Sequence, residues 1–408
     1  MGSEMVVTRC DVLVVGGGPA GAATAALAAR RGLAVLLVER AVFPRHKPCA
    51  EYLSPEAARD LEALGVLDEV EAAGAAKLRG FRLVSDDGAA VTGTFAGAVP
   101  FIPYREYGLA LPRATLDQIV LRAAGRAGAQ VRQGVALERL LVERGRVCGA
   151  HVREEGRRAE IRARVVVGAD GLNSLVAREL GVARQGRLRR LALVAHLEGV
   201  AGTSDLGEMF ARRGRYVGLA PIGRGRVNVA VVVPGTEAPC IARDPDAFFA
   251  AELRAVPELA RRLAGARTVR EVMITGPFAR RSRRVVADGA LLVGDAADFY
   301  DPFTGEGIFA ALRGGALAAE AIAGALAAGE ATAAALRPYV AARRRAFLGK
   351  WVLERIVAHG AACPLVMRRF TRRLAARTRV ADLWVGAAGD SVPVRVLFAP
   401  RQLAALMI

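Results

Sequence analysis

The sequence predicts an α/β fold, in which a Rossmann-type nucleotide-binding domain is interleaved with a β-sheet domain and followed by C-terminal helices. Three observations predict it. A glycine-rich turn joins an apolar strand to an alanine-rich helix near the N-terminus, strand-like alternation fills the middle of the chain, and helical periodicity runs from Ile308 onward. We expect the nucleotide-binding domain to comprise residues 8–76, 112–186 and 278–330, the second domain residues 77–111 and 187–277, and the helical region residues 331–408.

The composition is that of a folded protein with an excess of positive charge. Of its 408 residues, 53% are hydrophobic and 24% are charged, which is enough apolar material for a sizeable core. The net charge of +18 suits nucleic acid, an anionic membrane surface or an anionic cofactor, and an arginine- and alanine-rich genome produces the same excess. Because the sequence has no lysine run and no zinc-finger spacing, we expect no nucleic-acid partner.

The cysteines and the N-terminus indicate a cytoplasmic protein. The five cysteines are far apart and form no Cys-x-x-Cys pair, so we expect neither disulfides nor a metal site: Cys10, Cys49, Cys148, Cys240 and Cys363. Residues 1–9 are too short and too polar for a signal peptide, and we expect no membrane-spanning segment.

A complete strand–helix–strand unit begins the chain. We expect a buried strand at Asp11–Val15, a helix at Ala22–Arg31 and a second strand at Leu33–Glu39. Between the first two lies a Gly-x-Gly-x-x-Gly turn, whose glycines permit the tight turn, the approach of a pyrophosphate and close helix packing. The carboxylate of Glu39 suits a ribose without a 2′-phosphate. The expected nucleotide contacts are Gly16, Gly18, Pro19, Ala20, Gly21, Glu39 and Arg40.

Further strands and turns follow in the expected order. Asp86-Asp87-Gly88 predicts a hairpin turn within the alternating stretch Phe81–Phe95, and a helix is predicted at Leu111–Gly125. Short strands are predicted over Arg132–Val167 and Arg190–Pro234, and a buried strand at Ala290–Val293.

Two more motifs follow predicted strands. They are Gly168-Ala169-Asp170-Gly171 and Gly294-Asp295-Ala296-Ala297, and the second is followed by residues 301–308, Asp-Pro-Phe-Thr-Gly-Glu-Gly-Ile. Together with the N-terminal turn, these motifs resemble those of the aromatic hydroxylase and geranylgeranyl reductase superfamily of flavoproteins. The resemblance covers roughly residues 11–326.

The resemblance implies a non-covalently bound FAD. It implies that Asp295 bonds the ribityl chain, that Asp170 lies near both FAD and the route of a reduced nicotinamide, and that Arg113 touches FAD. The loop after Asp295 should lie against the flavin ring, where the amides at a helix N-terminus stabilise negative charge. The remaining implied contacts are Gly171, Gly294, Gly305, Glu306, Gly307 and Ile308.

The segment from Phe43 to Pro55 resembles a Lys-x-Cys-Gly…Leu-Ser-Pro stretch of geranylgeranyl reductases, with Ala50 in place of the glycine. The resemblance places it near the flavin, so Arg45, Cys49 and Ala50 are expected FAD contacts. A buried free cysteine is also an ordinary small core residue. The catalytic residues are not identified by the sequence. The flavin-proximal candidates are Cys49, His46, Pro302 and Gly305.

The reaction is less clearly marked than the cofactor. We expect an NAD(P)H-dependent monooxygenase, with NAD(P)H as a transient donor because no second dinucleotide-binding turn is present. The alternative is an isoprenoid C=C reductase, although the Tyr-x-Trp-x-Phe-Pro strand of such reductases has Gly218 and Ala220 at its bulky positions. The monooxygenase interpretation also has a departure from its pattern, because Asp298 stands where hydroxylases of the superfamily carry histidine. A halogenase is disfavoured because Trp351 and Trp384 form no Trp-x-Trp-x-Ile-Pro motif, and an electron carrier needs no substrate domain.

The expected substrate is a hydrophobic small molecule, because the cavity strand Tyr216–Pro221 is apolar. Peripheral contact with an anionic membrane is a further hypothesis. It rests on arginines interspersed with Phe370, Leu374 and Val380: Arg368, Arg369, Arg372, Arg373, Arg377 and Arg379. The alternative is that the same arginines form a basic helix face exposed to solvent. The sequence leaves the oligomeric state open.

Overall fold

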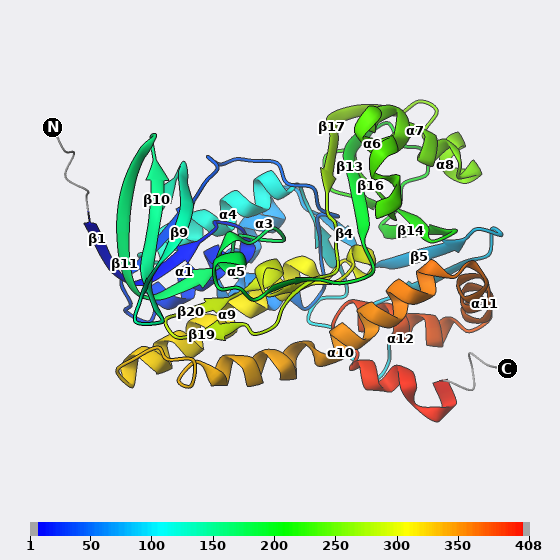
Figure 1. The fold of residues 1–408 in the computed structure, drawn as a ribbon. Coiled ribbons are helices and arrows are strands. Elements are labelled where there is room, and N and C mark those ends of the chain that lie inside the picture. The colour runs from blue at the N-terminus through cyan, green and yellow to red at the C-terminus, as the bar shows by residue number, and fades with distance from the viewer. Residues whose placement is uncertain (1–6, 403–408) are drawn as a thin grey trace.

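The structure, a computed structural model, describes residues 7–402 and confirms the predicted α/β fold class. Figure 1 shows two large sheets side by side, with the helices of the C-terminal region lying below both of them. The first sheet lies near the N-terminus and the second lies under a cap of short helices. The functional cavity described below is lined by residues from both parts and from the connecting segments.

The first sheet has a parallel centre. Within the described chain its main path runs β19-β20-β11-β1-β2-β8, and β1 pairs in parallel with both β2 and β11. The hairpin strands β9 and β10 extend it through β11. The bounds are β1 Val7–Val15, β2 Val35–Glu39, β8 Gln130–Gln133, β9 Val135–Glu143, β10 Arg146–Glu154, β11 Arg157–Gly168, β19 Val286–Ala287 and β20 Ala290–Leu292.

Helices cover one face of this sheet, and the β9–β10 hairpin with a short helix covers the other. The helices are α1 (Pro19–Ala29), α4 (Arg113–Arg126) and α9 (Gly307–Ala327), and α1 packs against both of the others. Residues of β9, β10 and α5 (Leu175–Glu179) form the second core. The carboxyl ends of β1, β11 and β20 therefore meet at one edge, the usual place for a ligand in such sheets.

Helix α1 starts earlier than predicted. The sequence pattern put its first residue at Ala22, whereas the structure begins the helix at Pro19, with Gly18 as the N-cap residue. Proline suits the first helical position because its φ is already helical and its missing N–H would have no partner there. The glycine-rich turn therefore passes directly into the helix.

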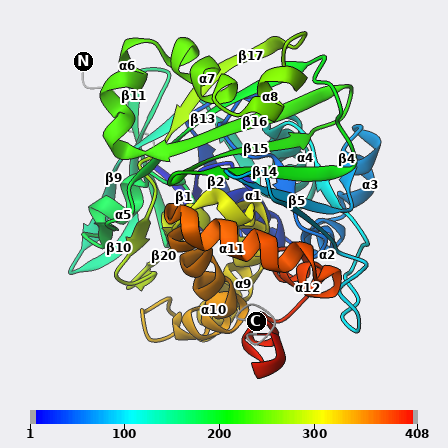
Figure 2. The ribbon, with the colours of Figure 1, turned by 90° about the vertical axis from the view of Figure 1, so that its right-hand side faces the viewer.

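Short helices lie along one side of the second sheet (Figure 2). Its order is β17-β13-β16-β15-β14-β5-β6, and β14 and β5 pair in parallel, which joins the two chain segments that build it. The bounds are β5 Gly80–Ser85, β6 Ala90–Thr94, β13 Arg190–Glu198, β14 Leu206–Arg212, β15 Arg215–Pro221, β16 Arg226–Pro234 and β17 Arg267–Thr275. Residues of its strands β13, β14, β15 and β16 line the cavity. Helices α6 (Ala238–Arg243), α7 (Pro245–Arg254) and α8 (Pro257–Arg262) close the outer core.

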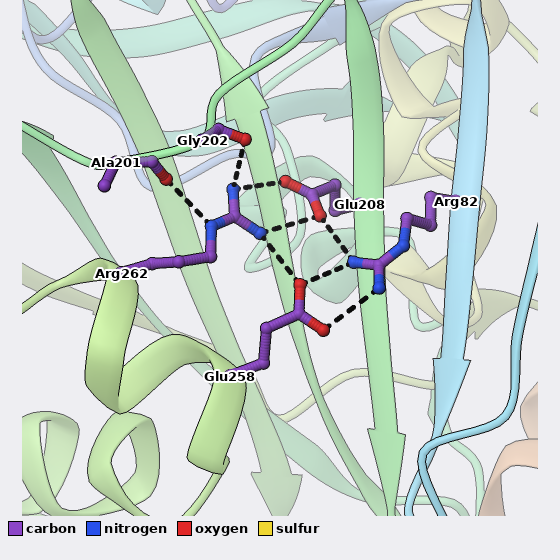
Figure 3. A network of polar contacts seen from close by, with 6 residues as sticks. All are labelled: Arg82, Ala201, Gly202, Glu208, Glu258 and Arg262. Atoms are coloured by element: carbon purple, nitrogen blue, oxygen red, sulfur yellow. Dashed lines mark hydrogen bonds and ion pairs between the residues drawn. The ribbon is translucent and has the colours of Figure 1, made fainter.

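An arginine–glutamate network fixes α8 to this sheet (Figure 3). Glu208 of β14 accepts from Arg82 of β5 at 3.1 Å and from Arg262 of α8 at 2.6 and 2.8 Å. Glu258 joins the same two arginines, and Arg262 also donates to the carbonyls of Ala201 and Gly202. Two carboxylates and two guanidinium groups balance each other, so the network stiffens the sheet behind the cavity.

The C-terminal helices are α10 (Arg337–Ala362), α11 (Pro364–Ala375) and α12 (Thr378–Ala388). They cover β5, β6 and the loop that precedes α9. Among the described residues, α9 alone is long and apolar enough to span a membrane by length and composition. More than half of its apolar window, 56%, is buried inside the fold, where it packs on α1. We therefore interpret α9 as a core helix.

Small sheets connect these parts. β3 (Tyr52–Leu53), β4 (Ala76–Leu78) and β7 (Gly108–Ala110) form one, beside the helices α2 (Ala57–Ala63) and α3 (Leu67–Ala72). β12 (Ala183–Gln185), β18 (Arg280–Ser282) and β21 (Asp298–Phe299) form another, next to the turn at Asp295 that follows β20.

Candidate functional site

The three motif glycines of the turn after β1 differ in how closely their neighbours approach them. Gly16 has φ +107°, and a Cβ on it would lie 2.5 Å from the carbonyl oxygen of Ala169. A Cβ on Gly21 would lie 1.9 Å from the carbonyl oxygen of Gly16, so α1 packs on the turn through glycine alone. A Cβ on Gly18 would instead make only ordinary contacts, at 3.8 and 4.0 Å from the guanidinium groups of Arg45 and Arg113, so packing does not require glycine there. These are the geometries that a phosphate-binding turn requires.

Glu39 stabilises that turn from the end of β2. The carboxylate is buried and accepts from the N–H of Gly17 at 2.7 Å and from the N–H of Ala41 at 2.9 Å. The sequence predicted a ribose contact for this carboxylate, and that role stays a prediction. Arg40, the next residue, is exposed.

The two guanidinium groups beside Gly18 share one carboxylate. Asp117, which is fully buried, accepts from Arg113 at 2.7 and 2.8 Å and from Arg45 at 2.9 Å. Burial alone would lower the pKa of Arg113, and the charge of Asp117 outweighs it, so its pKa stays above the ordinary value. One carboxylate against two arginines leaves a net positive charge next to the open turn, where a pyrophosphate would neutralise it.

Both strand-end aspartates lie at the same edge. Asp170 Oδ2 accepts from the amides of Leu175 and Val176, while its Oδ1 is buried with no partner among the described residues. Burial raises the pKa of Asp170 above its ordinary value. Asp295, after β20, is partly exposed and lies 3.9 Å from the Nζ of Lys47.

The loop before α9 is shaped by packing. Gly305 has φ +74°, and a Cβ on it would lie 2.9 Å from the ring of Tyr52. Glycine is therefore required there by the backbone and by Tyr52, a reason that the motif alone did not show. The first intrahelical bond of α9 runs from Ala310 N–H to Glu306 O, so the amides of Gly307 and Ile308 precede it. They are available to an acceptor at the helix N-terminus.

A buried ion pair fixes the same loop to the second sheet. Asp301 Oδ2 accepts from Arg190 Nη1 at 2.8 Å, and Asp301 Oδ1 accepts from the hydroxyl of Tyr216 at 2.8 Å and from the N–H of Phe303 at 3.1 Å. The side chains of Arg190 and Asp301 are 2% and 1% exposed. Arg190 also donates to the carbonyl of Ala358 in α10, so the network ties sheet, loop and C-terminal helix together.

Behind the loop lies a buried cluster with more acid than base. Lys350 of α10 forms ion pairs with Glu306 and Glu354, and Asp390 lies close enough to interact with it. Burial raises the pKa of Glu306 well above its ordinary value and that of Asp390 to about 7. Three carboxylates face one lysine in this cluster, and burial raises the pKa of all three.

Glu51 organises the segment that carries Cys49. This buried glutamate has φ +61° and receives hydrogen bonds at 2.6 Å from His196 Nε2, at 2.9 Å from Asn228 Nδ2 and at 2.9 Å from the N–H of Arg113. Asn228 also donates to the carbonyl of Cys49 at 2.8 Å. Neither Glu51 nor Asn228 is among the site residues predicted from the sequence. The one signal in the sequence is that Glu51 is an acidic residue inside the segment expected near the flavin.

These features enclose a cavity of about 160 Å³ between the nucleotide-binding sheet and the second sheet. The predicted contacts on its wall are Gly18, Pro19, Ala20, Cys49, Ala50, Arg113, Gly171, Asp295, Pro302, Gly305, Glu306, Gly307 and Ile308. Gly16, Gly21 and Gly294 act in packing behind the wall, as the close approaches of their neighbours show. His46 does not line the cavity, and the centroid of its ring lies 6.5 Å from that of His196.

Gly218 of β15 lines this cavity, as expected from its place in the apolar strand. Ala220, the other small residue of this strand, does not line the main cavity. It packs in a separate buried cluster with Tyr52 and Leu78, so only the change to glycine widens the main cavity.

A second cavity of about 180 Å³ lies alongside and is almost wholly apolar. Residues of β5, β6 and β14 form one wall, and α10, α11 and α12 form the other. Met209 lines both cavities, and Phe303 and Thr304 of the loop line the second. Two side chains, Ile356 and Val366, line this cavity and are also 42% and 51% exposed.

The main cavity fits FAD by its chemistry. The open turn at Gly18 lies beside a net positive charge from Arg45 and Arg113, which suits a pyrophosphate. The carboxylate of Asp295 supplies an acceptor on the cavity wall, whereas Asp170 lies behind the wall between Ala169 and Gly171, which line it. The N-terminus of α9 offers amides at the end nearest the second sheet, where a reduced flavin ring carries negative charge.

Comparison with known proteins agrees with this geometry. A family model described as an FAD binding domain matches residues 9–351. A digeranylgeranylglycerophospholipid reductase of Methanoculleus marisnigri is 32% identical over 356 residues, which are 85% of this chain and 84% of the relative. A 1H-pyrrole-2-carbonyl-[peptidyl-carrier protein] brominase of Pseudoalteromonas luteoviolacea is 26% identical, over 76% of this chain and 77% of the brominase.

Solved structures show the same fold. The myxobacterial chondrochloren halogenase superposes with a TM-score of 0.81 at 26% identity, over 91% of both chains. A geranylgeranyl bacteriochlorophyll reductase-like protein of Thermoplasma acidophilum gives a TM-score of 0.73 at 21% identity, over 98% of this chain and 96% of that one.

Fold and site together define an FAD-dependent oxidoreductase. The family match covers most of the chain, and a relative above 30% identity is covered over most of its length. The chain belongs to the FAD-binding-domain family, within the aromatic hydroxylase and geranylgeranyl reductase superfamily.

Proposed function

We propose that this oxidoreductase saturates C=C bonds of an apolar, isoprenoid-like substrate. The observation that supports it most is the second cavity, because an apolar space bounded by Met209 next to the flavin cavity suits a hydrocarbon chain with one end at the flavin. When bound, FAD supplies the hydride chemistry. The protein's part is to hold the chain, exclude water and keep the loop at Gly305 in place.

The relatives favour the same class of reaction. Digeranylgeranylglycerophospholipid reductases from several archaea are 28–33% identical to this chain over about four fifths of it. Gly218 departs from the bulky residue expected of such reductases, and it lines the main cavity. We therefore expect a substrate that is broader at the flavin than a linear polyprenyl chain.

A monooxygenase is the second candidate. The room left by Gly218 in the main cavity suits an aromatic or polyketide ring, and hydroxylases share the superfamily. A halogenase is the least favoured enzyme. The tryptophans, Trp351 and Trp384, lie in α10 and α12, outside the second sheet, and form no Trp-x-Trp-x-Ile-Pro motif.

Mass spectrometry distinguishes these reactions. Reduced holoenzyme is incubated with isoprenoid lipids and phenolic polyketides, without oxygen and then in air with bromide. A gain of two hydrogens without oxygen supports the proposal. A gain of one oxygen that requires air would replace it with monooxygenation, and a brominated product would replace it with halogenation.

We also propose that the enzyme is cytoplasmic and meets an anionic membrane through α10 and the start of α11. Five apolar residues of this segment are exposed, and two of them, Ile356 and Val366, also line the second cavity: Leu348, Val352, Ile356, Leu365 and Val366. Exposed Arg345 and Arg355 flank them, and this combination suits an anionic lipid surface.

This surface differs from the arginine-rich stretch that suggested it. Arg368 pairs with Asp86 at 2.7 and 2.8 Å, and Arg372 pairs with Asp87 at 2.5 Å, so these two arginines bind the acidic hairpin turn. Phe370 packs against Trp384 and lines the second cavity. The apolar side of α11 therefore covers the protein's own cavity.

A further inference from the structure

Met209 of β14 is the one residue among residues 7–402 that lines both the main cavity and the second, apolar cavity. The loop before α9 separates the same two spaces, since Pro302 lines the main cavity whereas Phe303 and Thr304 line the second. A ligand that extends from one cavity into the other would therefore pass between the side chain of Met209 and this loop.

The loop is the fixed side of this passage. Its Asp301 is bound to Arg190 at 2.8 Å in an ion pair that is almost completely buried. The ring of Phe303 packs edge-on against that of Tyr216, with the ring centroids 4.8 Å apart. Moving the loop would break the ion pair and leave the guanidinium of Arg190 without its countercharge, which is costly inside a protein.

Met209 is the movable side of the passage. Its thioether side chain is unbranched and flexible, so it adapts to the shape of its surroundings more easily than a ring or a β-branched side chain. In the antiparallel pair β14–β15, Met209 lies directly opposite Gly218, which has no side chain to hold it in place. A Cβ on Gly218 would lie 3.6 Å from Cε and 3.7 Å from Sδ of Met209, so the methionine lies over this glycine. The passage can therefore open by rotation of one side chain.

We propose that Met209 is a gate that determines chain-length specificity, because only a chain that displaces it can enter the second cavity. The inference rests on the proposed function, which takes an apolar isoprenoid-like chain as substrate. A short chain stays in the main cavity and leaves Met209 in place, whereas a longer chain passes it and buries its end between apolar walls. Ile356 and Val366, which line the second cavity and are 42% and 51% exposed, allow a still longer chain to extend toward the surface.

The gate predicts a step in affinity along a series of chains. Burial of each further methylene strengthens binding by about fourfold before the cost of ordering the chain is subtracted. A chain that gains one more isoprene unit inside the second cavity should therefore bind about tenfold more tightly or better. Chains that end before Met209 gain nothing from the second cavity, so the increase should come at one point of the series.

Titration of the oxidised, FAD-loaded protein with geraniol, farnesol and geranylgeraniol, followed by flavin absorbance, measures this step without turnover. These alcohols grow by one isoprene unit at a time. Met209→Trp should keep the affinity for the shortest alcohol that the wild type binds and should lose the tenfold step, because the larger ring closes the passage. Ile274→Trp is the matched control, since Ile274 is 44% exposed on β17 of the same sheet, and it should keep the step.

Met209→Ala provides a second arm, because it opens the passage instead of closing it. Rapid mixing should show geranylgeraniol binding about two- to tenfold faster than in the wild type, which corresponds to the cost of moving a side chain off its preferred rotamer. Geraniol should bind at the wild-type rate, because it does not pass the gate.

Three results would overturn the proposal. They are a wild-type series without a step, a step that persists in Met209→Trp, and equal association rates of geranylgeraniol in Met209→Ala and the wild type. If Met209→Trp also loses the short alcohols because the ring fills the main cavity, the rates of Met209→Ala decide alone. None of these measurements involves a reduced flavin or a product, so the gate and the proposed saturation of C=C bonds fail separately.

Discussion

Replacing Asp301 by asparagine should destabilise the protein strongly although the side chain keeps its shape. Asparagine can still accept from Tyr216 and Phe303, but the guanidinium of Arg190, 2% exposed, loses its countercharge. Breaking one partner of a buried ion pair costs about 3–5 kcal/mol. For a chain of 408 residues this corresponds to a fall of about 4–6 °C in the unfolding midpoint.

Differential scanning fluorimetry of the FAD-saturated protein measures this shift. Asp205→Asn is the matched control, because Asp205 pairs with Arg79 at 3.4 Å with both side chains more than half exposed. Such a pair contributes at most about 1 kcal/mol. A midpoint for Asp301→Asn within 1 °C of the control would refute the view that this pair holds the loop to the sheet.

Four further outcomes are expected. Acid precipitation should release yellow flavin into the supernatant, and flavin that stays with the pellet would contradict non-covalent binding. Asp295→Ala should weaken FAD binding by about tenfold, since a carboxylate–hydroxyl bond contributes about 1.5–3 kcal/mol; an unchanged dissociation constant, as expected for the exposed control Asp246→Ala, would remove Asp295 from the site. The raised pKa of Asp390 means that the stability it contributes is present below its ordinary pKa of 3.8 and is lost as the pH rises through about 7. Asp390→Asn should remove this pH-dependent loss of stability, which amounts to about 2 kcal/mol because the side chain has partial solvent access. A wild-type free energy of unfolding that stays constant from pH 4 to 8 would contradict this. Leu365→Glu should reduce co-sedimentation with anionic vesicles while Val142→Glu does not, and equal absence of wild-type binding to anionic and neutral vesicles would rule out the membrane contact.

The parts of the site formed by contiguous sequence could be predicted. The turn at residues 16–21 follows its strand directly, and backbone rules for glycine apply locally, so its place after β1 followed from the motif, although α1 begins within it at Pro19. The same holds for Gly294 and Asp295 after β20. The fold class followed from the alternation of strand and helix patterns along the chain.

The parts formed by distant residues could not be predicted. Glu51 meets His196 across 145 positions, and Asp301 meets Arg190 across 111. No periodicity links such pairs, because the sheets bring them together only after folding. The arginines of α11 show the same limit. Their spacing suggested a membrane face, while Arg368 bonds Asp86 from a turn 282 positions away.

The central claim is that reduced flavin in this protein delivers its electrons to an apolar alkene. Rapid mixing of the reduced holoenzyme with each member of a panel of isoprenoid lipids, both linear and ring-bearing, in the complete absence of oxygen, tests it most directly. The account predicts that the absorbance of oxidised flavin returns at a rate that depends on lipid concentration, with one saturated bond formed per flavin. Flavin that stays reduced with the whole substrate panel until oxygen is admitted would contradict the account.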